Sequence, residues 1–144
     1  MKYRLMISMF SFVLFTLSAS PALAGQVTIV NNTQNWNCYV QATGYFMSIP
    51  TQMDTTCALP GRTEGFHTSL SVGHIAAHCA YNGTSANPQG CTSFDTNYQD
   101  HQVQSKHFPI SGTWLPHRNF TVTVTGNAVI KGWGTGLNFE LTEN

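Results

Sequence analysis

Alternating apolar and polar residues predict short β-strands along the chain after residue 24. The clearest run is residues 120–125, where a phenylalanine and two valines alternate with three threonines, the pattern of a half-buried strand. Residues 27–30 are rich in β-branched side chains and end in two asparagines, and alternation returns at 137–141. No window of a dozen residues keeps a helical period with caps. Short strands about every ten residues favour an all-β fold, an antiparallel β-sandwich or a small barrel.

Two segments in the first half of the chain predict further strands. Residues 36–42 and 45–49 are short apolar stretches on either side of a glycine. In residues 66–72 the side chains suited to a buried face stand at even positions, whereas in residues 75–81 they stand at odd positions. One extra residue at Gly73, as in a β-bulge, would let both halves of one strand face the core.

The first 24 residues predict export. Lys2 and Arg4 precede an apolar run at 5–17, and Ala22-Leu23-Ala24 has the small-x-small pattern of a signal-peptidase site. The run is too short to span a membrane as a helix. We expect removal of residues 1–24 after Ala24, which leaves residues 25–144 as one β-sandwich domain. The leader is of bacterial type, so we expect a secreted or periplasmic protein.

The cysteines predict a disulfide framework. An even number of cysteines in an exported protein favours structural bridges, and four allow three connectivities. The pairings Cys38–Cys57 and Cys79–Cys91 each close a short loop across an expected turn, and each loop would contribute about 3 kcal/mol. The chain has no C-x-x-C spacing, which disfavours a redox or zinc-ribbon role.

Charge is sparse and unclustered. Loss of Lys2 and Arg4 leaves four basic side chains against six acidic ones, a net charge of −2 with neutral histidines. Binding to nucleic acid or to an anionic lipid surface needs several Lys or Arg on one face, so we exclude both. Thr, Ser, Asn and Gln supply the polarity instead, which suits a surface that meets neutral ligands.

No motif specifies a reaction. His74 and His78 have H-x-x-x-H spacing, which brings two rings together on a helix. On a strand the same residues lie about 13 Å apart, and the alternation favours a strand. Sequence spacing leaves open a long-range site drawn from His67, His101, His107 or His117. Ser71-Val72-Gly73 lacks the first glycine of a nucleophile elbow. We therefore expect no catalytic residue, no metal ligand and no cofactor, with a small secreted hydrolase as an alternative.

Aromatic residues in expected loops predict a binding surface. Trp133 lies within the glycine-rich stretch 132–136 and Trp114 within the bend 112–116. A loop tryptophan offers a flat face for a sugar ring or a lipid interface, although either ring could instead fold back onto an end of the sandwich. We expect Trp133, Trp114 and Tyr98 to bind a neutral ligand, a glycan or the cell envelope.

The chain also resembles the aegerolysins, small exported β-sandwich cytolysins. The shared features are an opening Val-x-Ile strand with an asparagine turn, Gly61-Arg62 followed by Glu64-Gly65, and a glycine-rich final hairpin. The chain departs from that family in its longer 82–118 segment and in lacking an acidic tryptophan-rich motif. We therefore assign no family. The resemblance implies a membrane-active cytolysin, with a lipid membrane as partner, as the alternative function.

Overall fold

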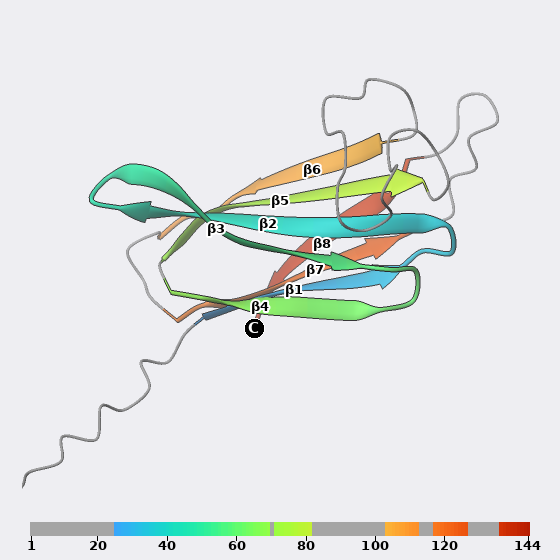
Figure 1. The fold of residues 1–144 in the computed structure, drawn as a ribbon, viewed down its shortest axis with the longest axis horizontal. Helices are drawn as coiled ribbons and strands as arrows, with labels where there is room; N and C mark the ends of the chain where they lie inside the picture. Colours follow the sequence, from blue (N-terminus) through green and yellow to red (C-terminus); the bar gives the residue numbers. More distant parts are fainter. Residues whose placement is uncertain (1–24, 70, 82–102, 113–116, 127–135) are drawn as a thin grey trace, which may run out of the picture.

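The computed structural model describes residues 25–69, 71–81, 103–112, 117–126 and 136–144 (Figure 1). These residues form strands joined by turns and short connections. The strands are β1 (Gly25–Asn32), β2 (Trp36–Phe46), β3 (Ile49–Ala58), β4 (Thr63–Thr68), β5 (Val72–Tyr81), β6 (Val103–Pro109), β7 (Asn119–Thr125) and β8 (Asn138–Glu143). Within the described ranges, no helix has the length and apolarity needed to cross a membrane.

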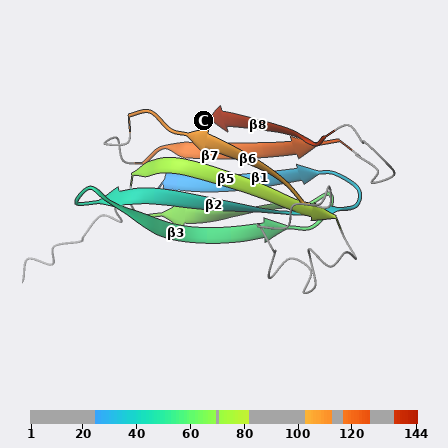
Figure 2. The same cartoon turned by 90° about the horizontal axis from the view of Figure 1, so that it is seen from above.

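The strands form two four-stranded sheets that lie face to face (Figure 2). One sheet has the order β4-β1-β7-β8 and the other β3-β2-β5-β6. The expected all-β sandwich is therefore confirmed. The expected antiparallel pairing is wrong for one pair, because β1 and β7 run parallel. Between these two strands the chain crosses to the second sheet twice, through β2-β3 and through β5-β6, with β4 of the first sheet in between. Such a crossover connection allows β1 and β7 to point the same way.

The core lies between the sheets and is built by the alternation that the sequence shows. On β7, Phe120, Val122 and Val124 are buried while the threonines between them are partly exposed. The fully buried apolar side chains from the other strands include Val27, Ile29, Trp36, Val40, Ala42, Ile75 and Ala77. The Trp36 ring meets Tyr81 edge-on, with ring centroids 5.3 Å apart. One of the three tryptophans is therefore a core residue.

The segment 66–81 is divided between the sheets. β4 ends at Thr68 in the first sheet and β5 begins at Val72 in the second, so the expectation of one bulged strand is wrong. The expected irregularity at Gly73 is nevertheless present. Thr43 pairs with His74 and Gly44 with Val72, so the register skips Gly73. The bulge keeps both Val72 and Ile75 in the core.

The described residues contain one disulfide, Cys38–Cys79, and this corrects the expected connectivity. The two residues face each other across β2 and β5 with Cα atoms 4.1 Å apart, and both are fully buried. Cys57 pairs with Tyr39, the neighbour of Cys38, so its side chain leaves the opposite face of the sheet. Cys57 is not a free thiol, and Cys91 lies outside the described residues.

The Asn31 side chain joins the two sheets at one end of the core. It lies on β1 of the first sheet, at a core-facing position after Val27 and Ile29, and is fully buried. Its amide nitrogen donates to the carbonyls of Trp36, at 2.7 Å, and Ala58, at 2.8 Å, both in the second sheet. Its oxygen accepts from the backbone N–H and the hydroxyl of Thr33.

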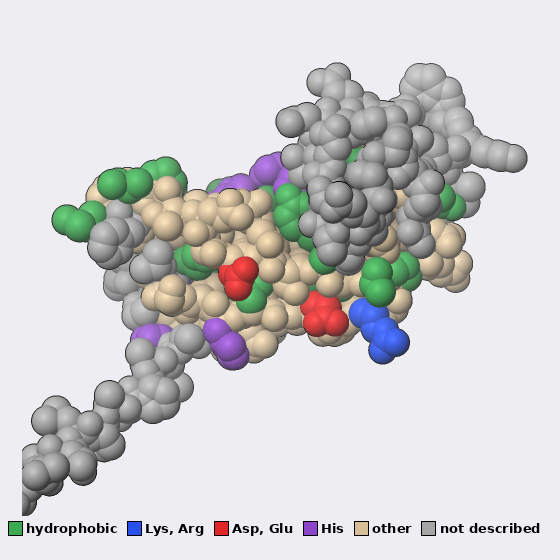
Figure 3. All heavy atoms as spheres, in the orientation of Figure 1, with side chains coloured by type: hydrophobic (Ala, Val, Ile, Leu, Met, Phe, Trp, Pro, Cys, Tyr) green, Lys and Arg blue, Asp and Glu red, His purple; other side chains and the backbone are tan. Residues whose placement is uncertain are grey.

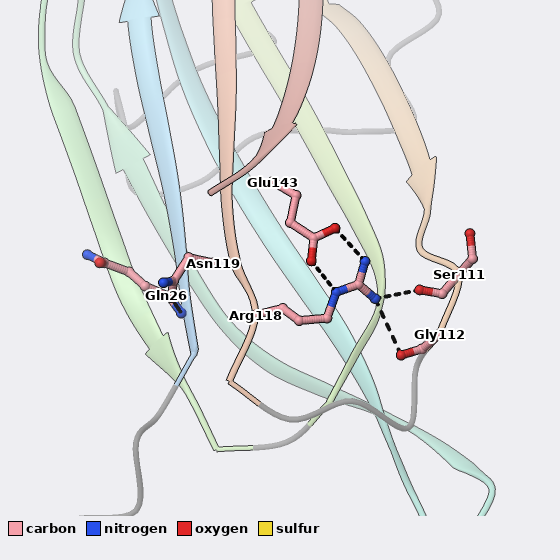
Figure 4. Close-up of polar contacts among 6 residues, drawn as sticks. All are labelled: Gln26, Ser111, Gly112, Arg118, Asn119 and Glu143. Carbon is pink, nitrogen blue, oxygen red and sulfur yellow. Dashed lines mark hydrogen bonds and ion pairs between the residues drawn. The ribbon is translucent and has the colours of Figure 1, made fainter.

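Arg118 organises the start of β7 at the other end (Figure 4). Its guanidinium makes a two-point contact with Glu143 on β8, at 2.5 and 2.7 Å, and also donates to the carbonyls of residues 111 and 112. The hydrogen bond with Glu143 raises the pKa of Arg118 and lowers that of Glu143. Next to it, the Asn119 side-chain oxygen accepts from the backbone N–H of Gln26 on β1. These contacts fix where β7 enters the sheet.

The first prediction concerns the disulfide. Peptide mapping without reduction should yield a linked pair of peptides containing Cys38 and Cys79. Replacing both with alanine should lower the free energy of unfolding by about 4 kcal/mol, because the bridge closes a long loop, as measured by urea denaturation. Recovery of a Cys38–Cys57 peptide would contradict this pairing.

The second prediction concerns Asn31. Asn31→Asp keeps the shape but removes the donors, which leaves two buried carbonyls beside a carboxylate. The free energy of unfolding should fall by about 3–5 kcal/mol, measured by urea denaturation at neutral pH. The matched control is Asn32→Asp on the exposed next position of β1, which should cost under about 1 kcal/mol. Equal effects of the two substitutions would rule out the proposed role of the Asn31 amide.

Candidate functional site

The end of the β2–β3 hairpin is the most exposed apolar feature among the described residues. The hairpin extends beyond the other strands at one end of the sandwich, and green side chains gather at its end (Figures 1 and 3). Tyr45 is 47% exposed, Met47 82% and Ile49 64%. We call these three residues the hairpin tip. The tip is a projection rather than a hollow, so it suits insertion into an apolar surface.

The backbone of the tip is unusual for the residues that form it. Phe46 pairs with Ile49, so the loop consists of Met47 and Ser48 alone. Both have positive φ, 49° and 68°, as in the type I′ turn that favours Asn-Gly. A left-handed conformation costs about 1–2 kcal/mol for an ordinary L-residue. The chain thus places a large exposed apolar side chain where turn stability alone would favour a small polar residue or glycine.

The sequence around the tip carries no charge. Residues 25–53 contain no Lys, Arg, Asp, Glu or His, and Asp54 is the first ionisable acid after them. Burying a charge is far more costly than burying a neutral polar group. The tip can therefore enter an apolar environment without desolvating a charged neighbour.

A second feature is a row of rings on the outer face of the sheet β3-β2-β5-β6. Tyr39 stacks on His78 at 4.9 Å, His78 meets His107 edge-on at 5.6 Å, and His107 stacks on His74 at 5.2 Å. The register of β5 and β6 explains why the His107 ring lies between those of His74 and His78. His107 on β6 pairs with Ala76, so it lies diagonally between the two histidines of β5. We call His74, His107 and His78 the histidine row.

Burial and repulsion from neighbouring imidazoles lower the pKa of two members of the row, His74 and His78. The pKa of His78 is lowered to about 4, mainly by burial and further by repulsion from His107 and His74. The Nδ1 atom of His78 is hydrogen-bonded to the Ser105 hydroxyl at 2.7 Å. Burial and His107 also lower the pKa of His74, and burial raises that of Tyr39. His74, His78 and Tyr39 are therefore neutral at neutral pH.

The Ser105–His78 contact does not by itself make a hydrolytic site. A Ser-His pair is activated by a carboxylate that orients the base. The described groups that shift the pKa of His78 are histidines, and no acid is among them. The described part of the chain also holds no group of three or more His, Cys, Asp or Glu side chains placed to share a metal ion.

The expected ligand-binding residues Trp133, Trp114 and Tyr98 lie outside the described residues, so their role stays a prediction. The hairpin tip was missed because the sequence predicts a strand at 45–49, where the structure has a turn. The sequence signal for the tip is the apolar run 45–49, which makes a turn without Gly or Asn at its centre. The histidine row could not be predicted from sequence spacing, because it depends on the pairing of His107 with Ala76 across two strands.

The third prediction concerns His78 and pH. Its pKa is about 4 in the folded protein and about 6.5 when unfolded. The unfolded chain therefore takes up the proton first, so stability is full above about pH 6.5 and falls toward pH 4. The loss should reach about 3 kcal/mol, followed by urea denaturation with EDTA present. His78→Gln should remove most of this slope, whereas His67→Gln on the other sheet should keep it. An unchanged slope in His78→Gln would contradict the assignment.

Comparison with known proteins assigns no family. No protein-family model matches the chain, and no curated protein or solved structure matches it either.

Proposed function

We propose that this is an exported, non-enzymatic binding protein that docks on electrically neutral surfaces through the hairpin tip. The observation that carries the proposal is Met47, 82% exposed in a two-residue loop with positive φ at both positions. Exposed apolar side chains held in a costly conformation are typical of sites maintained for contact rather than for stability.

A neutral lipid interface is the surface that suits the tip best. Sugar binding relies on a flat ring together with converging polar groups, whereas Met47 and Ile49 are flexible or aliphatic. Tyr45, one step up the hairpin, has the amphipathic character of residues at membrane interfaces. The uncharged stretch 25–53 also favours a neutral surface over an anionic one.

The size of the tip limits its affinity. Burying Met47 and Ile49 would contribute about 1.5–3 kcal/mol each, and about 4 kcal/mol corresponds to millimolar binding. The tip alone therefore supports weak, reversible docking. Lysis, the activity that the aegerolysin resemblance implies, would need further contacts. Trp133, Trp114 and Tyr98 are the residues we propose for them, and a glycan or the cell envelope is the alternative ligand of those three.

We further propose that the protein acts outside the cytoplasm, after removal of residues 1–24. The Cys38–Cys79 bridge supports an oxidising location. The remaining pair of cysteines, Cys57 and Cys91, would form the second bridge. This pairing agrees with the bonded state of Cys57.

The fourth prediction separates binding from stability at the tip. Replacing Met47 with Asn and Ser48 with Gly gives the sequence that the turn favours, so the free energy of unfolding should rise by about 1 kcal/mol. Loss of the methionine should lower binding to phosphatidylcholine vesicles about tenfold or more. Stability is measured by urea denaturation and binding by vesicle flotation.

Leu59→Asp is the matched control for Met47→Asp. Leu59 is 51% exposed and follows β3 at the opposite end from the tip. Met47→Asp should abolish flotation with the vesicles, and Leu59→Asp should leave it unchanged. Equal flotation of all variants, or binding that requires anionic lipid, would refute docking through the tip. Binding to glycans without lipid would favour the alternative ligand.

A further inference from the structure

We propose that His74 and His107 form a binding site for one divalent transition-metal ion of the zinc or copper type. The two residues lie on adjacent strands, β5 and β6, on the outer face of their sheet. This inference is independent of the hairpin tip, which lies on other residues and uses other chemistry.

The spacing of the rings fits a shared ion. With Zn–N bonds of about 2.0–2.1 Å, two imidazoles at a tetrahedral angle have centroids roughly 5 Å apart. The centroids of His74 and His107 are 5.2 Å apart. Neighbouring strands place diagonal residues within reach of each other's long side chains. The two rings are stacked at 29° to each other, so binding requires the side chains to rotate until one nitrogen of each ring faces the ion.

The access of solvent to the pair also suits a ligand role. His107 is exposed and His74 partly exposed, so an ion from solvent can reach them. Imidazole binds metals through a ring nitrogen that carries no proton. Imidazole suits zinc, copper, iron and nickel.

His78 acts as a positioning residue in this site. Its Nδ1 is hydrogen-bonded to Ser105 at 2.7 Å, which fixes the ring, and its ring meets His107 edge-on. A fixed neighbour restricts the orientation of His107, as outer-shell contacts do for metal ligands. Two protein ligands leave the remaining coordination positions to water, consistent with the described residues offering no set of three ligands.

The test is titration of the untagged, EDTA-treated protein with Zn²⁺ by isothermal calorimetry at about pH 7.5. Wild type should bind one Zn²⁺ per chain. His74→Ala and His107→Ala should each weaken binding at least about tenfold, and His78→Gln should weaken it less. The control His67→Ala, an exposed histidine on β4, should bind within about twofold of wild type. Circular dichroism should show that every variant is folded.

A second readout follows the folded protein directly. Zn²⁺ should raise the Tm of wild type and of His67→Ala but not of His107→Ala, because a ligand that binds only the folded state stabilises it. Cu²⁺ should bind more tightly than Zn²⁺ at the same residues. Absence of saturable Zn²⁺ binding up to about 1 mM, or His107→Ala with wild-type affinity, would overturn the proposal. Loss of binding in His67→Ala would do so as well.

Discussion

The amide of Asn31 satisfies a requirement that every two-layer β structure must meet where its strands leave the core. Packing two sheets buries apolar faces, but it also buries backbone carbonyls at the ends of strands, where the sheet no longer supplies partners. Asn31 projects from the first sheet and donates to Trp36 and Ala58 in the second. Only a side chain with two donors at this position serves both carbonyls. This polar link therefore closes one end of the apolar core between the sheets.

The strand that leads into the hairpin tip is held at several points in the second sheet. β2 lies between β3 and β5, its Trp36 end is bound to Asn31, and Cys38 ties it covalently to β5. A strained two-residue turn survives only when its surroundings hold it in place. The pairing of Phe46 with Ile49 continues to the end of the hairpin. The frame therefore holds the backbone on both sides of Met47, which reduces the backbone entropy that a docking contact would lose.

The sequence predicts what depends on local pattern and misses what depends on register. Alternation at Phe120, Val122 and Val124 and the bulge at Gly73 are local and were predicted. The Cys38–Cys79 bridge was not, because short-loop closure favoured sequence neighbours while β2 and β5 place distant residues face to face. β6 was missed because it lies at a sheet edge and shows little alternation. His107 joins His74 for the same reason that the bridge forms, through cross-strand pairing.

The hairpin tip and the histidine row both depart from what stability alone would favour, but under different conditions. Asn-Gly suits the turn better at any pH, whereas the low pKa of His78 costs stability only below about pH 6.5. Neither feature contributes to the core, whose apolar residues lie between the sheets. Natural sequences break local rules mostly at functional sites. The ligands proposed for the two features differ, an apolar phase for the charge-free tip and a metal ion for His74 and His107. Because the two proposed sites share no residue, a substitution in one leaves the other intact.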